Sequence, residues 1–231
     1  TYTKVSPVMP ASIQAAAYAD TEILFDWHKV EGFKGGAIDG IKVIVRGTDG
    51  AAQTMVAIDL LFATSHIPTP SDGVNVSVDV APTTLGTTGA AVDTPGWFNN
   101  LVGHVPVLAA DFNDADLIYL NIANVNLSGE EIPVSGDLYV AAVAKGALDF
   151  RTTATVNESN FAAGTQTVIT IADKDATLGF APGDVVHAVD DAVLGTIKTV
   201  DSATQITLTK ANQDAIEDDD VIYNVSPIQL I

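Results

Sequence analysis

The sequence predicts an all-β protein. We expect an antiparallel β-sandwich or jelly-roll-like domain with an extended N-terminal arm, followed by a small SH3-like or OB-like β-barrel. Short runs rich in β-branched residues recur along the chain, separated by turns rich in glycine, proline, aspartate and asparagine. No long helical pattern alternates with these runs, which disfavours a parallel α/β sheet. With 231 residues, the chain is long enough for one β domain and a small second one.

Residues 1–10 are predicted to form an extended arm, because Pro7 and Pro10 are incompatible with a helix here. The apolar residues of the arm have little to bury among themselves, and they are Tyr2, Val5, Val8 and Met9. We therefore expect the arm either to fray or to lie on a neighbouring subunit.

Residues 11–154 are predicted to form the sandwich domain. Residues 73–80 alternate strictly between valine and polar residues, and residues 40–46 alternate in a similar way. Further strands are expected at residues 21–27, 54–62, 102–108, 117–122 and 137–143, and short helices are possible at residues 11–19 and 111–117. A long loop at residues 81–96 precedes Trp97 and Phe98, which are either core residues or an interface anchor.

The last third of the chain is predicted to be a separate barrel. Residues 155–164 are mostly polar and small, so we place a linker there, and we assign residues 165–231 to the barrel domain. Its strands are expected at residues 165–171, 184–189, 194–200, 204–209 and 220–225.

Charge is distributed unevenly along the chain. Ten Lys and Arg residues oppose twenty-nine acids, for a net charge of -19, so binding to nucleic acid or to an anionic membrane is disfavoured. Half of the basic residues fall in the first fifth of the chain, and they are Lys4, Lys29, Lys34, Lys42 and Arg46. Either the acidic surface simply keeps molecules apart in solution, or the N-terminal fifth contacts an acidic partner.

No motif for catalysis or cofactor binding is present. The chain has no cysteine, no phosphate-binding loop and no nucleophile elbow, and its four histidines are scattered. Acidic runs at residues 111–116 and 217–220 are expected to be solvated turns, with a calcium site as the alternative. The sequence therefore indicates no known class of enzyme, and no cofactor or metal is predicted.

Four short motifs follow one another in the first two thirds of the chain. A Gly35-Gly36 turn leads into the strand at residues 41–43, and an apolar strand ends in Leu-Phe at residues 58–62. The segments LVGHVPV at residues 101–107 and LYVAAVAKGA at residues 138–147 follow. In this order the motifs resemble a family of tailed-bacteriophage capsid-associated proteins encoded beside the major capsid protein. The resemblance covers a little over half of the chain, and family members usually end soon after the last motif, whereas this chain adds the barrel.

The resemblance implies a capsid decoration, or cement, protein without enzymatic activity. Such a protein binds the major capsid protein on the outside of an icosahedral head, as a homo-oligomer such as a dimer or trimer, and is made in the host cytoplasm. The candidate contact residues lie in the arm, in the basic stretch and after the long loop, and they are Tyr2, Lys4, Val5, Val8, Lys29, Lys34, Lys42, Arg46, Trp97 and Phe98. The alternatives are a surface-displayed, adhesin-like module that binds glycan or protein through residues 81–97 or the barrel, and, last, an enzyme with a carboxylate pair.

Overall fold

The computed structural model describes most of the chain, namely residues 2–9, 17–46, 53–64, 101–112, 120–150, 153–157, 160–172, 176–188 and 193–231. These residues form an all-β fold of antiparallel sheets, with one helical turn at α1 (Ala176–Gly179) and a 3-10 turn at Ala109–Asp111. The predicted strand at residues 73–80, the loop at residues 81–96, Trp97 and Phe98 lie outside the described residues.

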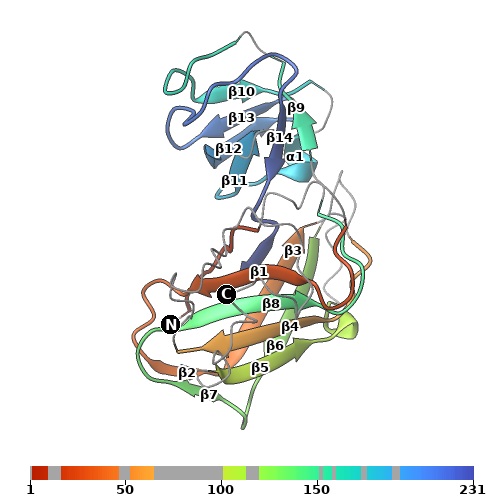
Figure 1. Cartoon of the computed structure of the whole chain (residues 1–231), viewed down its shortest axis with the longest axis vertical. Coiled ribbons are helices and arrows are strands. Elements are labelled where there is room, and N and C mark those ends of the chain that lie inside the picture. Colours follow the sequence, from red (N-terminus) through yellow and green to blue (C-terminus); the bar gives the residue numbers. More distant parts are fainter. Residues whose placement is uncertain are drawn as a thin grey trace, which may run out of the picture.

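Three sheets make up the lower half of the molecule in Figure 1, which we call the first body. The four-stranded sheet has the order β1 (Ile23–Lys29), β8 (Tyr139–Ala144), β4 (Ile58–Ala63) and β5 (Leu101–Val107). The three-stranded sheet has the order β15 (Ile228–Leu230), β3 (Gly40–Arg46) and β6 (Leu120–Asn126). A two-stranded sheet pairs β2 (Gly36–Ile38) with β7 (Ile132–Val134).

The two larger sheets of the first body share one hydrophobic core. Leu60 and Val140 of the four-stranded sheet belong to the same buried cluster as Val43 and Leu230 of the three-stranded sheet. Along β8, successive residues alternate between this cluster and a second one on the opposite face, which contains Ala141, Val143, Ile23 and Leu61. Because both faces are buried, the sequence of β8 is almost continuously apolar instead of alternating.

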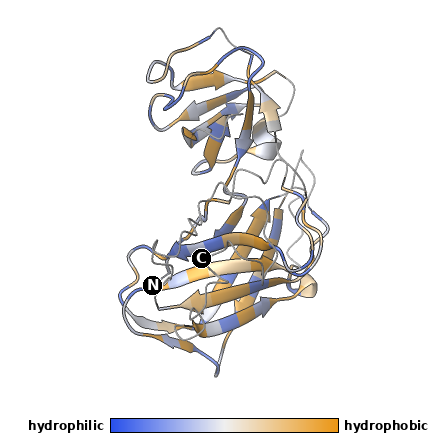
Figure 2. Cartoon of the chain, viewed as in Figure 1, coloured by the Kyte–Doolittle hydropathy of each residue, from blue (hydrophilic) through white to orange (hydrophobic). Residues whose placement is uncertain are grey.

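A curled six-stranded sheet forms the second body. Its strand order is β10 (Val168–Thr170), β13 (Gln205–Leu208), β12 (Val193–Ser202), β11 (Val185–Ala188), β14 (Val221–Asn224) and β9 (Thr153–Thr155). Backbone hydrogen bonds from Asn157 to Thr170 and from Ala172 to Thr155 join the two ends of the curled sheet. It encloses a core of its own, with Ile169, Leu194, Ile206 and Ile222 at its centre, and Figure 2 shows apolar residues along the strands of both bodies.

Strand pairing crosses the domain boundaries that the sequence predicts. Residues 228–230, assigned to the barrel, pair with β3 and complete a sheet of the first body. Residues 153–155, at the end of the predicted sandwich and the start of the predicted linker, form the edge of the six-stranded sheet. Within the predicted linker, Val156 is fully buried and Phe161 pairs with Ile216. The second body is therefore inserted into the first, between β8 and β15.

The predicted strand at residues 40–46 is confirmed to the residue, and the other predicted strands in the described ranges lie within a few residues of those observed. Residues 54–57 are not in a strand. Of the possible helix at residues 11–19, residues 11–16 lie outside the described part, and Tyr18 forms a β-bridge with Leu148. Tyr18 is 1% exposed and its ring meets Phe150 edge-on, at 5.9 Å between centroids.

Candidate functional site

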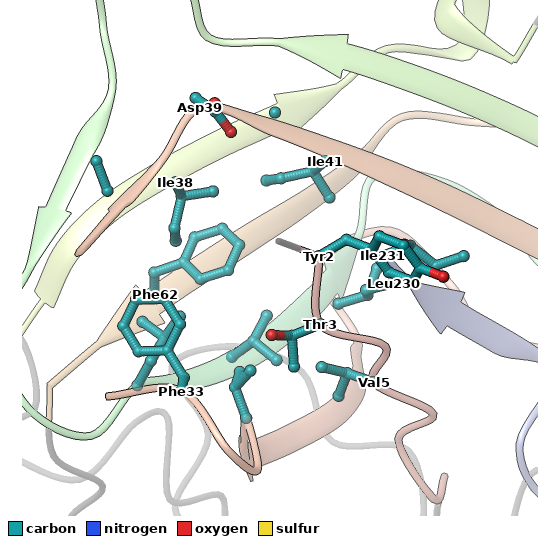
Figure 3. Close-up of a pocket in the computed structure, with 15 residues that line it drawn as sticks. Tyr2, Thr3, Val5, Phe33, Ile38, Asp39, Ile41, Phe62, Leu230 and Ile231 are labelled. Atoms are coloured by element: carbon teal, nitrogen blue, oxygen red, sulfur yellow. The ribbon is translucent and has the colours of Figure 1, made fainter. Parts of the chain in front are cut away.

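A pocket of about 210 Å³ lies between the two large sheets of the first body, beside the N-terminal arm (Figure 3). We call it the arm pocket. Ile41 of β3 and Leu230 of β15 line one side, and Phe62 of β4 and Val140 of β8 line the other. Phe33, in the turn after β1, completes the aromatic part of the wall. The walls are apolar because they are the exposed end of the sandwich core, to which these strand residues also belong.

The arm forms the remaining wall of the arm pocket, through Tyr2, Thr3 and Val5. Val5 exchanges two backbone hydrogen bonds of 2.8 Å with Leu230, and the Met9 N–H donates to the Val225 carbonyl at 2.7 Å. The structure thus shows a third arrangement, in which Val5 and Met9 of the arm pair with the C-terminal segment of the same chain. The edge of β15 offers free backbone groups and apolar cover, so the arm docks on its own chain.

Because the arm docks on its own chain, some of its predicted contact residues are buried and others stay exposed. Val5 is 7% exposed and Met9 is fully buried, so their side chains belong to the core. Val8 is partly buried and packs against the same core. Tyr2 is 81% exposed at the rim of the pocket, and Lys4 is also exposed. Of the arm, Tyr2 and Lys4 are therefore the residues that a partner can reach most readily.

Four of the five predicted basic contacts are next to pocket-lining residues in the sequence. Lys4, Lys29, Lys34 and Lys42 each directly precede or follow a residue that lines the arm pocket. Lys29 bonds the Asp137 carboxylate at 2.8 Å, and this hydrogen bond raises the pKa of Lys29 above its usual value. Lys34 and Lys42 are exposed and take part in no ion pair within the described part of the chain. Because Lys42 alternates with Ile41 along β3, the two side chains lie on opposite faces of the sheet, and Asp39 has the one charged side chain among the residues that line the pocket.

Arg46, the fifth basic residue, lies at the junction of the two bodies, where it forms an ion pair. Its guanidinium is 2.9 Å from the carboxylate of Asp184, which precedes β11, and this ion pair joins the two bodies. The Asp184 side chain has no solvent exposure and that of Arg46 is 13% exposed. Because it is held in this buried pair, Arg46 is not available as a contact for another protein.

Asp184 is the centre of a buried polar cluster at the junction of the two bodies. Its carboxylate accepts hydrogen bonds from the Ala181 N–H at 2.8 Å and from the Asn224 side-chain amide at 2.9 Å. Burial raises the pKa of Asp184 from 3.8 to about 6, although Arg46, these hydrogen bonds and the charge of Lys4 oppose the increase. The cluster is thus a structural connection between the two bodies.

Neither acidic run has the arrangement of a metal site in the described residues. The Asp111 carboxylate accepts the Leu108 N–H at 2.8 Å, and residues 113–119 lie outside the described part. The Asp220 carboxylate accepts the Glu217 N–H at 2.7 Å, which closes a turn. Within the described ranges, no group of three or more His, Asp or Glu residues is placed to hold a metal ion.

A second hollow, of about 250 Å³, lies beside Gln53 and Asp149. The Gln53 side chain accepts the Asp149 N–H at 2.9 Å and donates to the Arg46 carbonyl at 3.3 Å. Its polar groups are thus used to hold neighbouring loops together. For this reason we take the arm pocket as the candidate site.

Sequence reasoning found the arm and the lysines but missed the pocket between them. Phe33, Phe62 and Leu138 come from three separate segments, and nothing local in their sequences marks them as neighbours. The absence of β15 from the predicted strands is the main reason, because this strand gives the arm its place. A short apolar run at the end of the chain, residues 228–231, was the available signal.

Comparisons with protein-family models, with curated proteins and with solved structures found no match for this chain. Among the described residues, none of the helices has the length and apolar character needed to cross a membrane.

Proposed function

We propose that this chain is a capsid decoration protein, which binds the outer surface of an icosahedral phage head and stabilises contacts between capsomers. The observation that supports this best is that the exposed Tyr2 lines a pocket beside the arm, and that Lys4, Lys29, Lys34 and Lys42 each directly precede or follow a residue of its lining. These residues belong to the arm and to the basic stretch that the sequence analysis selects as candidate contact elements. The partner is the major capsid protein, and the bound state is a homo-oligomer.

A decoration protein acts by binding, so its fold has to hold the contact surface in a fixed shape. A clamp that binds only the assembled shell shifts the assembly equilibrium towards the shell by mass action. In this proposal the clamp consists of the two β bodies, which a buried ion pair joins. The remaining acidic surface keeps unbound copies apart in solution. The second body, which we take to be an SH3-like or OB-like barrel, is then displayed away from the shell.

The test adds purified protein to phage heads that lack it. We expect saturable binding in a fixed ratio to the major capsid protein, together with greater resistance of the heads to heat and osmotic shock. The double substitution Lys34→Glu and Lys42→Glu is expected to weaken binding by about tenfold or more, since it removes positive charge from the contact face.

The matched control is Lys210→Glu, an exposed lysine of the second body, which we expect to bind like the unchanged protein. If the unchanged protein does not bind such heads at any concentration, the proposal fails. Binding to bacterial surface material alone would instead support the adhesin-like alternative.

A further inference from the structure

We infer that the arm pocket binds a small organic amine, with the ammonium group of the ligand beside the Asp39 carboxylate and its apolar part between the two sheets. This inference goes beyond the proposed function and does not depend on it, because it concerns a free small molecule and not the contact with a capsid.

The arm pocket has the composition of a small-molecule site, in which apolar walls surround a few polar groups. Its polar side chains are those of Tyr2, Thr3 and Asp39, and the other lining residues are apolar or glycine. Its volume is about 210 Å³, and an apolar cavity of roughly 150 Å³ is enough to bind benzene. The pocket therefore has room for one ring with a short chain attached.

The charge in the lining of the pocket is negative. Among the described residues that line it, Asp39 has the one charged side chain. This side chain is exposed and takes part in no ion pair within the described part of the chain, so a cation can reach it without breaking an existing pair. Figure 3 shows Asp39 at one end of the pocket, next to Ile38 and Ile41, with Phe62 farther along. A ligand whose ammonium meets Asp39 can therefore place its apolar part against these three side chains.

Three of the four lysines near the lining in sequence do not supply free positive charge to the pocket. Lys42 lies on the face of β3 that is turned away from the core. Lys29 is held by Asp137 at 2.8 Å. Lys4 lies near enough to Asp184, at the junction of the two bodies, for its charge to lower the pKa of that carboxyl.

The field of the whole molecule also favours a cation. The chain has a net charge of -19, so it concentrates cations at its surface and repels anions. Lys34, exposed in the turn after β1, is the remaining lysine next to a lining residue, and its single charge opposes this field locally. An amine with a Lys34→Gln variant therefore tests the sign of the charge that the pocket accepts.

The aromatic residues of the pocket suit the same class of ligand. Tyr2, Phe33 and Phe62 all line it, and the faces of aromatic rings attract organic cations. Tyr2 is 81% exposed, so its ring is accessible at the rim. The same rings pack against the apolar part of an amine, so charge and apolar contact act on one ligand.

The experiment titrates the full-length protein with three compounds of similar size and follows amide chemical shifts. The probe is phenethylamine, and the comparison compounds are phenethyl alcohol, which is neutral, and hydrocinnamate, which is an anion. We expect shift changes at Phe33, Ile38, Asp39 and Phe62. The amine should bind about threefold to tenfold more tightly than the alcohol, and the anion should bind most weakly.

Two pairs of variants locate the binding. Asp39→Asn should weaken binding of the amine to the level of the alcohol and leave binding of the alcohol unchanged, whereas Glu217→Gln, at an exposed acid of the second body, should affect neither compound. Ala37→Phe places a ring at an exposed position in the wall of the pocket and should weaken both compounds by about tenfold, whereas Ala37→Ser should not. Lys34→Gln should strengthen binding of the amine.

Several results would overturn the inference. These are equal binding of the amine and the alcohol, tighter binding of the anion, absence of binding, shift changes outside the arm pocket, or an equal effect of Asp39→Asn and Glu217→Gln. All five substituted positions are exposed or half-buried, and an amide spectrum that is otherwise unchanged shows that each variant is folded. Phage heads take no part in this experiment, so its outcome and that of the capsid-binding test are separate.

Discussion

The two bodies of this molecule are assembled from the chain in different ways. The second body uses residues 153–225, an almost continuous stretch, and its curled sheet is closed by hydrogen bonds between its first and last strands. The first body combines the arm, residues 17–150 and β15, so its central three-stranded sheet needs a strand that follows the entire second body. The second body can therefore complete its core by itself, whereas the first body cannot do so until the end of the chain returns.

Because the second body is inserted into the first, the two bodies are connected at more than one place. The chain passes between them twice, before β9 and after β14, and the arm adds a third contact through Met9 and Val225. The Arg46–Asp184 ion pair lies at the same place. An inserted body held at two chain crossings has a restricted orientation, which suits a rigid binding protein.

Removing residues 227–231 gives the largest expected effect. Ile228 and Leu230 are 1% and 4% exposed, and their loss, together with the partner of Val5, should cost about 5 kcal/mol or more, comparable with the whole stability of a domain. Hydrogen exchange should show the first body unprotected and the second body still folded. Leu230→Met, which conserves volume, should change stability by less than about 1.5 kcal/mol. If the amides of the first body stay protected from exchange after the truncation, the first body does not need β15 to complete its core, and the contrast between the two bodies is wrong.

A pair of core substitutions tests whether the bodies unfold separately. Leu60→Ala in β4 and Ile206→Ala in β13 each remove a fully buried side chain and should each cost about 2–5 kcal/mol. Hydrogen exchange at Phe62 and Leu208 reports on the two bodies. We expect each substitution to increase exchange in its own body much more than in the other. Equal increases in both would show that the junction makes them one cooperative unit.

The junction itself predicts a dependence of stability on pH. The folded protein holds a proton on Asp184 up to about pH 6, whereas the unfolded chain releases it near pH 3.8. The folded state therefore binds more protons between these values, and stability from this group falls as pH rises through the window, by about 3 kcal/mol in total. Denaturant unfolding between pH 4 and about 7 should show this slope in the unchanged protein. It should be absent in Asp184→Asn, and an identical slope in both would refute the assignment.

Much of the local structure could be predicted from the sequence, for a physical reason. Residues 40–46 alternate because one face of β3 is buried and the other is not, and that pattern is visible without any partner strand. Five of the six strands of the second body, β10 to β14, were predicted because each lies in a short, β-branched run bounded by turns. The strands β2, β7, β9 and β15 were missed, since each has only three residues and their pairing depends on distant segments.

By itself, the sequence determined the all-β class, most strand positions, the uneven charge and the basic residues of the first fifth of the chain. These are properties of composition and of short-range periodicity, which a single strand already has. Only the tertiary structure decided that Arg46 is buried against Asp184 while Lys34 and Lys42 stay unpaired, that the arm docks beside β15, and that a pocket opens between them. Those features depend on contacts between residues far apart in the chain, and no local pattern specifies which distant segments meet.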